Sequence, residues 1–304
     1  PSLFLNPDQQ SYRCFGCGAR GDALTWVMAR NGWTFREALA YLANLVGVPM
    51  TAGAARPVQA RGRTPQPTPP AAPVVPPDAT WQARARLILG RAQEVLWSDA
   101  GDVGRAYLQA RGLQESTLRA WGLGWCPRDV FDTPEQWGLT GKRIYVPRGV
   151  VIPHFVGDEL WALKVRRFVG DAPATADNGG KYGGPRGGQI TLYGAERLQG
   201  QRPLFIVEAE LDALLLWQVA GDLVDVVALA GAGRTLPAQW LARLLPYTRI
   251  FAALDADKAG TLNATRLAAL SARVTPVRVP EGNDMTEYHQ AGGDVRAWVM
   301  AVVG

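Results

Sequence analysis

The stretch LFIVEAELDALLL, residues 204–216, contains the change of hydrophobic pattern that decides the fold of the C-terminal third of the chain. Its first four residues are all apolar and predict a buried strand, and the residues after them predict a helix over about 209–220. Glu208 stands directly after the strand, and Asp212 follows one helical turn later on the same face. A strand that leads into a helix in this way predicts one unit of a parallel sheet.

The same alternation of strands and helices continues towards the C-terminus. Strands are expected in DVVALA (225–230), RIFAALD (249–255) and VTPVRVP (274–280), and helices near 236–245, 258–271 and 294–302. This order favours a mostly parallel sheet covered by helices. Residues 203–304 are therefore predicted to form one α/β domain.

Acidic residues come after the predicted strands in three places. Besides Glu208 with Asp212, the groups are Asp255 with Asp257 and Asp284 with Glu287. The carboxyl ends of parallel strands form the ligand crevice of an open sheet, so we expect these groups to face one site. Crowded carboxylates repel one another unless a cation lies between them, and hard oxygen ligands suit Mg²⁺. Taken singly, each group could instead be a solvated loop residue or a helix N-cap.

The bulk composition restricts the class of protein. At 304 residues the chain can hold two or more domains with cores of their own. No stretch reaches the roughly 18 apolar residues of a membrane span, so no membrane partner is expected. The net charge of +5 and the pI near 9.3 are compatible with a polyanionic partner. Three cysteines, two of them in one C-x-x-C, favour a reducing, cytoplasmic location over a disulfide-bonded protein.

Residues 1–48 are predicted to form a small unit that binds a metal ion. SYRCFGC predicts a hairpin strand, and TFREALAYLANLVGV predicts an amphipathic helix that Thr34 and Glu37 begin as a capping box. Cys14 and Cys17 have the spacing of two thiolate ligands on one tight turn, but a structural zinc ion needs four ligands. The other cysteine and the two histidines lie far along the chain and are treated as non-ligands: Cys126, His154 and His289.

Between this unit and the C-terminal domain the composition changes twice. Residues 49–79 are rich in Pro and Ala and predict an extended, semi-stiff linker. Residues 80–202 predict a mixed α+β region that is helical to about Trp121 and then rich in strands. A Gly-rich basic loop, NGGKYGGPRGGQ, lies at 178–189.

Taken together, these segments resemble the DnaG-type primases of bacteria. FIVEAELDALLL, FAALDADKAG and GNDMTEY are similar to the three acidic motifs of a TOPRIM domain. SYRCFGCGARGDALTWVMARNGWTFREALAYLA resembles the second half of the family's zinc-binding domain, and YLQARGLQESTLRAWGLGWCP resembles the segment that opens its polymerase domain. RIYVP, ALKVRRF, KYGG and LYGAERL then follow in the family's order, so the resemblance covers nearly the whole chain apart from the linker.

The resemblance implies a multidomain protein of the α+β and α/β classes. Its parts would be a partial, zinc-ribbon-like module at 1–48, the Pro-rich linker at 49–79, the basic subdomain of a primase core at 80–202 and a TOPRIM sheet at 203–304. It also implies that Cys14 and Cys17 are the downstream half of a zinc site whose first two ligands, a Cys and a His, precede Pro1. The alternative is a site that was lost in evolution.

The implied activity is that of a nucleotidyltransferase that copies single-stranded DNA into short RNA primers from NTPs at the replication fork. A replicative helicase is a further implied partner, reached through another segment or another chain. The implied catalytic residues are Glu208, Asp255 and Asp257. The implied ligands of Mg²⁺ or Mn²⁺ are Glu208, Asp212, Asp255, Asp257 and Asp284, whereas Thr286, which stands where the family often has a second Asp, is not included. The residues implied to face phosphates are Arg143, Lys164, Arg166, Arg167 and Lys181.

Residues in a strand point alternately to its two faces, so Lys164 and Arg166 are expected on one face and Arg167 on the other. Two other functions remain open at this point. One is a TOPRIM hydrolase that cuts nucleic acid with the same carboxylates and Mg²⁺, although the basic region and the zinc-type segment disfavour it. The other is a DNA-binding module without catalytic activity, which the intact acidic motifs disfavour.

Overall fold

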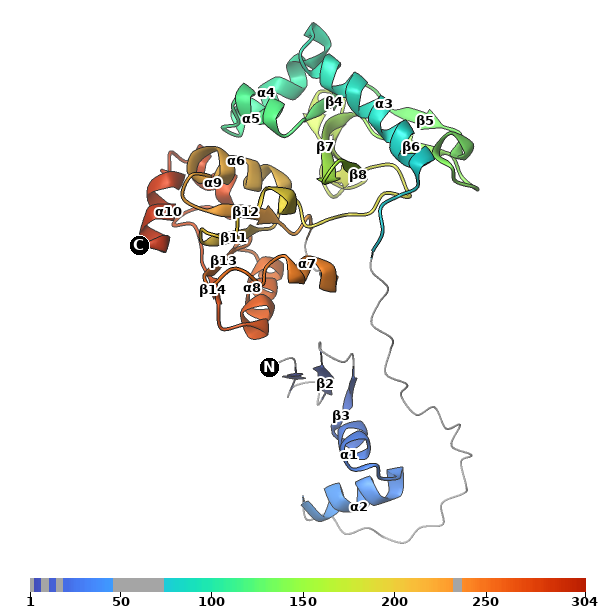
Figure 1. The fold of residues 1–304 in the computed structure, drawn as a ribbon, viewed down its shortest axis with the longest axis vertical. Coiled ribbons are helices and arrows are strands. Elements are labelled where there is room, and N and C mark those ends of the chain that lie inside the picture. The colour runs from blue at the N-terminus through green and yellow to red at the C-terminus, as the bar shows by residue number, and fades with distance from the viewer. Residues whose placement is uncertain (1–2, 7–10, 15–18, 46–73, 232–236) are drawn as a thin grey trace. The chain divides into compact units, whose positions relative to one another are not determined.

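The computed structural model describes residues 3–6, 11–14, 19–45, 74–231 and 237–304. The chain divides into two compact units, one up to residue 72 and one from residue 73 onwards. The first is blue in Figure 1, and the second runs from cyan to red. Within the described residues, no helix combines the length and the apolar character that crossing a membrane requires.

The first unit pairs a small antiparallel sheet with two helices. Its strands are β1 (Leu3–Asn6), β2 (Ser11–Cys14) and β3 (Arg20–Asp22), in the order β1-β2-β3, and its helices are α1 (Ala23–Asn31) and α2 (Phe35–Leu45). The expected hairpin strand and the capping box are confirmed. The Thr34 backbone N–H donates to Glu37 Oε2 at 2.7 Å, and the Glu37 N–H donates back to Thr34 Oγ1 at 3.4 Å. Cys14 ends β2, whereas Cys17 lies outside the described residues.

The C-terminal part of the second unit is the predicted parallel sheet. Its strands are β11 (Leu204–Val207), β12 (Asp225–Ala228), β13 (Ile250–Ala253) and β14 (Val274–Pro276), all parallel, in the order β12-β11-β13-β14. Its helices are α6 (Glu210–Ala220), α7 (Ala238–Ala242), α8 (Lys258–Leu270), α9 (Met285–Gln290) and α10 (Val295–Val303). The predicted strands and helices of this region are therefore confirmed, with α7 and β14 shorter than expected, whereas α9 was not expected.

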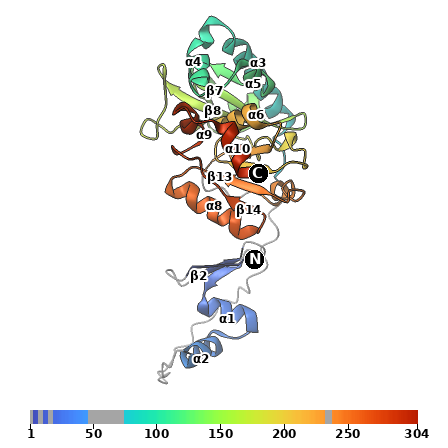
Figure 2. The same cartoon turned by 90° about the vertical axis from the view of Figure 1, so that its left-hand side faces the viewer.

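Alternation along β11 explains why helices cover both faces of this sheet. Phe205 and Val207 belong to a core that includes α6 and α10, and Leu204 and Ile206 belong to a second core that includes α7 and α8. Figures 1 and 2 show α6, α9 and α10 on one side of the strands and α8 on the other. A strand buried on both faces reads as a continuous apolar run, and LFIV is such a run.

The part before it is a mixed α+β region around an antiparallel sheet. The helices are α3 (Ala79–Leu96), α4 (Asp102–Ala110) and α5 (Glu115–Ala120). The main sheet has the order β10-β8-β7-β4, and β9 pairs with β8. Its strands are β4 (Gly124–Cys126), β7 (Gly149–Val156), β8 (Glu159–Val169), β9 (Ala172–Pro173) and β10 (Tyr182–Gly183), and β5 (Val130–Asp132) pairs with β6 (Ile144–Val146) in a separate ribbon.

The two parts of the second unit share one core. A single cluster of buried side chains joins Trp125 and Ile152 of the antiparallel region to Phe205 and Trp298 of the parallel region. The end of the expected linker also belongs to this unit, because the Gln239 side chain donates to the Val74 carbonyl at 2.9 Å and Asp78 is the N-cap of α3. The start of the expected linker lies outside the described residues.

Gly149, at the start of β7, occupies a position that leaves no room for a Cβ atom. It has φ +148° and lies opposite Arg167 of β8, and a Cβ at this position would come within 2.0 Å of the Arg166 carbonyl oxygen. We therefore expect Gly149→Ala to cost about 1–3 kcal/mol of unfolding free energy, because the strand pair must shift or remain strained. Urea unfolding measures it.

Gly90→Ala is the matched control for this substitution. Gly90 lies inside α3, and a Cβ there would meet nothing within 4 Å. Alanine is the better helix former, so this variant should be more stable than the wild type by about 0.5–1 kcal/mol. Equal stability of the two variants would show that the close approach at Gly149 relaxes freely.

Candidate active site

Glu208 is positioned by the end of β11. The strand is fully buried, and the Glu208 carboxyl group leaves it at the edge where the parallel strands end. Glu208 Oε2 is buried and, within the described part of the chain, accepts no hydrogen bond. Burial, followed by the negative charge of Asp257, raises the pKa of Glu208. A buried carboxylate oxygen without a donor is a position that a cation would satisfy.

Asp255 and Asp257 are positioned by the turn between β13 and α8. Asp257 is the N-cap of α8 and accepts a hydrogen bond from the Gly260 N–H at 2.8 Å. Gly260 lies so close to the turn that a Cβ would come within 2.1 Å of the Asp255 carbonyl oxygen. Burial, followed by the charges of Glu208, Asp212, Asp284 and Asp257, raises the pKa of Asp255 to about 8. The negative charges of the other four acidic residues thus all contribute to the raised pKa of Asp255.

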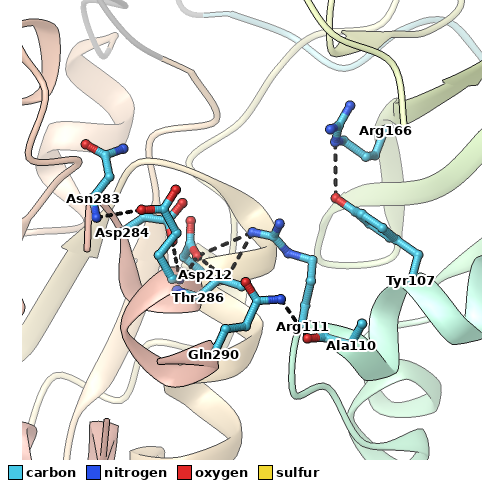
Figure 3. Close-up of polar contacts among 10 residues, drawn as sticks. Tyr107, Ala110, Arg111, Arg166, Asp212, Asn283, Asp284, Thr286 and Gln290 are labelled. Atoms are coloured by element: carbon cyan, nitrogen blue, oxygen red, sulfur yellow. Dashed lines mark hydrogen bonds and ion pairs between the residues drawn. The ribbon is translucent and has the colours of Figure 1, made fainter. Parts of the chain in front are cut away.

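Asp212 and Asp284 come from α6 and from the start of α9. Asp212 is 3% exposed, and its Oδ1 accepts from the Thr286 hydroxyl at 2.6 Å and from the Thr286 N–H at 3.3 Å. Asp284 is the N-cap of α9 and accepts from the Glu287 N–H at 2.7 Å. Burial, followed by the charge of Asp284, raises the pKa of Asp212 to about 6. Figure 3 shows Asp212, Asp284 and Thr286 side by side.

The five predicted acidic residues therefore lie in one electrostatic neighbourhood. The set consists of Glu208, Asp212, Asp255, Asp257 and Asp284. Each member either raises the pKa of another member by its negative charge or has its own pKa raised in this way. The N-cap alternative also holds for Asp257 and Asp284, which cap helices as well as belonging to the cluster. Among the described residues, no three acidic, histidine or cysteine side chains are close enough to hold one ion by themselves. Mg²⁺ commonly uses one or two carboxylates, with phosphate and water oxygens as its other ligands, and this donor set fits that pattern.

Arg111 enters the acidic cluster from the other half of the unit and was not identified from the sequence. It directly follows α4, and its Nη2 donates to Thr286 Oγ1 at 3.0 Å and lies 3.8 Å from Asp212 Oδ1. Gln290 of α9 donates to the Ala110 carbonyl at 2.7 Å and so ties the end of α4 to the cluster (Figure 3). The only sequence signal for Arg111 was its place in YLQARGL, a segment to which the resemblance assigned no catalytic role.

Lys164 lies elsewhere than the resemblance implied. It is 9% exposed, and its Nζ donates to both carboxylate oxygens of Glu210 at 2.7 and 2.8 Å and to the Ala230 carbonyl at 3.0 Å. His154 Nε2 lies 3.2 Å from Glu210 Oε1, and both side chains are fully buried. The Lys164 ammonium is thus held by Glu210 and the Ala230 carbonyl, which speaks against the expected contact with phosphates. The reason is that the N-terminal turn of α6 covers this part of β8 and brings Glu210 onto it.

Glu210 was also not identified from the sequence. Burial raises its pKa, but the charge of Lys164 and the contact with His154 outweigh burial and lower the pKa to about 2. Glu210 follows Glu208 by two residues in the same acidic stretch, and only its burial against β8 separates the two roles.

The remaining predicted basic residues lie around the antiparallel sheet. Arg166 donates to Tyr107 Oη at 3.2 Å and to two carbonyl groups, and the Tyr107 ring lies 5.9 Å from its guanidinium and 5.7 Å from that of Arg111. Arg167 donates instead to the carbonyls of Gly179 and Gly180, on the other face of β8 as alternation requires. The Lys181 side chain is exposed, and Arg143 lies over the Phe131 ring in the β5–β6 ribbon.

Two family models match separate segments of the chain. A model described as a CHC2 zinc finger matches residues 1–56, and a model described as Toprim-like matches residues 205–289. Among curated proteins, the chain is 26% identical to the DNA primase of Myxococcus xanthus, over 96% of this chain and 50% of that protein. It is 27% identical to the DNA primase of Geobacillus stearothermophilus, over 97% of this chain and 52% of that one. The chain thus spans about half the length of these relatives.

Solved structures of primases share the fold. The zinc-binding and RNA polymerase domains of the Aquifex aeolicus primase match with a TM-score of 0.52 at 21% identity, over 100% of this chain and 75% of that one. A DnaG primase catalytic domain bound to single-stranded DNA matches with a TM-score of 0.55 at 18% identity, over 73% of this chain and 78% of that one. The mixed antiparallel region and the parallel sheet together therefore have the fold of a DnaG catalytic core.

Proposed function

This chain is a relative of the bacterial DnaG-type DNA primases, and we propose that it synthesises short RNA primers on a single-stranded DNA template. The observation that carries this proposal is the acidic cluster at the carboxyl ends of β11 and β13, where burial, followed by the charges of the neighbouring carboxylates, raises the pKa of Asp255 to about 8. A cluster of mutually repelling carboxylates is suited to bind a divalent cation together with a triphosphate. We propose NTPs as the substrates and the replication fork as the place of action, with a replicative helicase as a further partner.

We propose that Asp255 and Asp257 are the principal ligands of Mg²⁺ or Mn²⁺, with Asp212 and Asp284 in support. When bound there, such an ion would lower the pKa of the attacking 3′-hydroxyl and stabilise the charge that develops on the leaving pyrophosphate. Glu208, a member of this cluster, has a buried oxygen that accepts no hydrogen bond from the described residues, which supports a role as general base or as a further ligand. Thr286 positions Asp212 through two hydrogen bonds, and Arg111 offsets part of the negative charge of the cluster.

The residues proposed to face phosphates of the template or nucleotide are Arg143, Arg166, Arg167 and Lys181. Arg166 is favoured because its guanidinium and that of Arg111 both lie by the Tyr107 ring, and Lys181 is favoured by its exposed side chain. Lys164 is reassigned to the buried ion pair with Glu210. For the first unit, we propose that it binds zinc with Cys14 and Cys17 among the ligands, which the match of a CHC2 zinc-finger model to this segment supports.

Product analysis tests the proposed function directly. The protein is incubated with single-stranded DNA of mixed sequence, labelled NTPs and Mg²⁺, and the products are separated by size. New short oligonucleotides that require both template and metal support the proposal. Cleavage of a labelled strand without synthesis would indicate a TOPRIM nuclease instead, and binding without either reaction would indicate a DNA-binding module.

Lys181→Ala tests the basic surface by binding rather than by chemistry. The Lys181 side chain is exposed, so its removal should leave the fold intact. We expect weaker binding of single-stranded DNA and a logarithmic salt dependence whose slope is smaller by about one, the value for one lost phosphate contact. Fluorescence anisotropy across a salt series measures both. An unchanged slope would show that Lys181 is a solvated surface residue without a phosphate contact.

A further inference from the structure

A network of buried charges joins the antiparallel sheet to the first turn of α6. The Lys164 ammonium has three N–H donors, and it has three acceptors: the two Glu210 oxygens at 2.7 and 2.8 Å and the Ala230 carbonyl at 3.0 Å. Glu210 is fully buried, and His154 Nε2 lies 3.2 Å from its Oε1. His154 Nδ1 in turn lies 3.1 Å from Thr191 Oγ1. The proposed reaction uses none of these side chains.

Glu210 lies between two members of the acidic cluster in the chain. Glu208 precedes it by two residues, and Asp212 follows it by two. Residues two apart in an α-helix are separated by roughly 200° around the axis, so Glu210 and Asp212 point to nearly opposite sides of α6. Glu210 contacts β8, whereas Asp212 contacts Thr286 of α9. A Glu210 carboxylate anchored to β8 therefore fixes the rotation of the turn that carries Glu208 and Asp212.

The third Lys164 contact holds an unusual residue of the neighbouring turn. Ala230 has φ +62° and, among the described residues, is the one residue other than glycine with a positive φ. A residue with a Cβ adopts this conformation at a cost, and it persists only where the surrounding structure fixes it. β12 and β11 end in register, with Ala228 opposite Val207, so the turns that follow these strands start side by side. The hydrogen bond to Ala230 thus fixes the turn next to Glu208.

The charge of Lys164 also reaches Glu208. Burial, followed by the charge of Asp257, raises the pKa of Glu208, and the charge of Lys164 is one of two influences that act in the opposite direction. Glu208 Oε2 is buried and accepts no hydrogen bond from the described residues, so this oxygen is placed by the turn that carries it. Lys164 therefore acts on Glu208 both through the backbone of this turn and through its field.

We propose that the Lys164–Glu210 pair positions the metal-binding edge of the parallel sheet. Through this pair, the antiparallel sheet sets the orientation in which Glu208 and Asp212 meet a divalent cation. The proposal rests on the proposed function only in taking the acidic cluster as a site for Mg²⁺ or Mn²⁺. A buried ion pair that only added stability could lie anywhere in the core, whereas this one ties the turns after β11 and β12 to β8.

The test measures the Mn²⁺ affinity of the full chain in the double variant Lys164→Met/Glu210→Gln. Both substitutions keep the length of the side chain and remove its charge. Electron paramagnetic resonance follows free Mn²⁺, and the part of the binding that Asp255→Asn removes is assigned to the acidic cluster. Loss of the groups that orient metal ligands lowers metal affinity about 10- to 100-fold, and we expect this loss in the double variant. Lys164→Met alone, which leaves His154 beside Glu210, is a second variant in which we expect a loss in the same direction.

Primer synthesis supplies a second measurement. In the double variant, the Mg²⁺ concentration that gives half the maximal rate should rise by a similar factor, because the site must be filled by a higher concentration of metal. A smaller fraction of folded protein would instead lower the rate by one factor at every Mg²⁺ concentration. A change in the rate alone would therefore contradict the positioning role.

The Arg84–Asp132 pair supplies a matched control for lost stability. Arg84 of α3 donates to both carboxylate oxygens of Asp132 of β5, at 2.9 and 2.8 Å, and the side chains are 21% and 8% exposed. Neither residue belongs to the acidic cluster or to the turns after β11 and β12. Arg84→Met/Asp132→Asn should unfold at a lower urea concentration than the wild type and bind Mn²⁺ with the affinity of the wild type.

Two results would overturn the proposal on its own. One is Mn²⁺ binding by the double variant with the affinity of the wild type, and the other is an equal loss of affinity in the Arg84→Met/Asp132→Asn control. Wild-type Mn²⁺ binding that does not depend on Asp255 would overturn both this proposal and the proposed metal ligands. If the wild type makes no primers while the double variant still loses the Asp255-dependent binding, the positioning role stands and primer synthesis is rejected.

Discussion

Asp255→Asn is expected to lower primer synthesis at least about 10²-fold, which corresponds to about 3 kcal/mol of transition-state stabilisation. The substitution keeps the size and shape of the side chain but removes a hard anionic ligand from the centre of the acidic cluster. Alignment of the α-phosphate and activation of the 3′-hydroxyl should both suffer. Binding of single-stranded DNA should survive, because the basic residues proposed to carry it precede Leu204. Steady-state synthesis and anisotropy on the same preparations separate the two effects.

Asp222→Asn is the control for this variant. Asp222 lies after α6 and away from the strand ends, and its two carboxylate oxygens pair with Arg296 at 2.6 and 2.7 Å. The pair is exposed, so its loss should change stability little and synthesis not at all. Equal losses of activity in the two variants, or full activity of Asp255→Asn, would show that the acidic cluster is not the active site.

The same substitution has a pH signature without metal. The folded protein raises the pKa of Asp255 from 3.8 to about 8, so the folded state disfavours the charged form. The resulting loss of stability is absent below pH 3.8 and grows as the pH rises towards 8. In a chelator, Asp255→Asn should therefore melt at a higher temperature than the wild type, with a difference that increases from about pH 5 to about pH 8. A pH-independent difference would contradict the clustering of the carboxylates.

Glu210→Gln is expected to produce the largest loss of stability, about 3–5 kcal/mol. Glu210 is fully buried, and both its oxygens accept from the Lys164 ammonium. Removing its charge leaves the Lys164 charge buried without a counter-ion, which costs more than the pair itself contributes. The pair joins α6 to β8, so its loss also weakens the contact between the two halves of the unit. Urea unfolding measures the change.

The double variant Lys164→Met/Glu210→Gln identifies the cause. Because neither buried charge remains, we expect it to recover about 2 kcal/mol or more relative to Glu210→Gln alone. The wild type should in addition lose stability as the pH falls from 4.5 towards 2, the interval over which Glu210 stays charged only when folded. The double variant should lack this dependence. If the stability change of the double variant equals the sum of the changes in Lys164→Met and Glu210→Gln, Lys164 and Glu210 act independently.

The sequence by itself determined the elements and the acidic motifs. Strands such as LFIV are apolar throughout, and each is followed by a segment long enough for a helix, so local pattern was enough to place β11, α6, β13 and α8. The carboxyl ends of parallel strands lie at one edge of a sheet, so the positions of Glu208 and Asp255 directly after two such strands were enough to assign them to one site. The capping box of Thr34 and Glu37 was likewise a local signal.

Only the tertiary structure decided what the charged side chains between those motifs do. Glu208 and Glu210 are two residues apart and chemically identical, yet one has a buried oxygen without a donor among the described residues and the other is enclosed by Lys164 and His154. Lys164 carries the same charge as Lys181, but α6 covers the first and leaves the second exposed. Arg111 reaches Asp212 from a position 101 residues earlier in the chain. Burial and contact between distant segments set these roles, and neither is a property of local sequence.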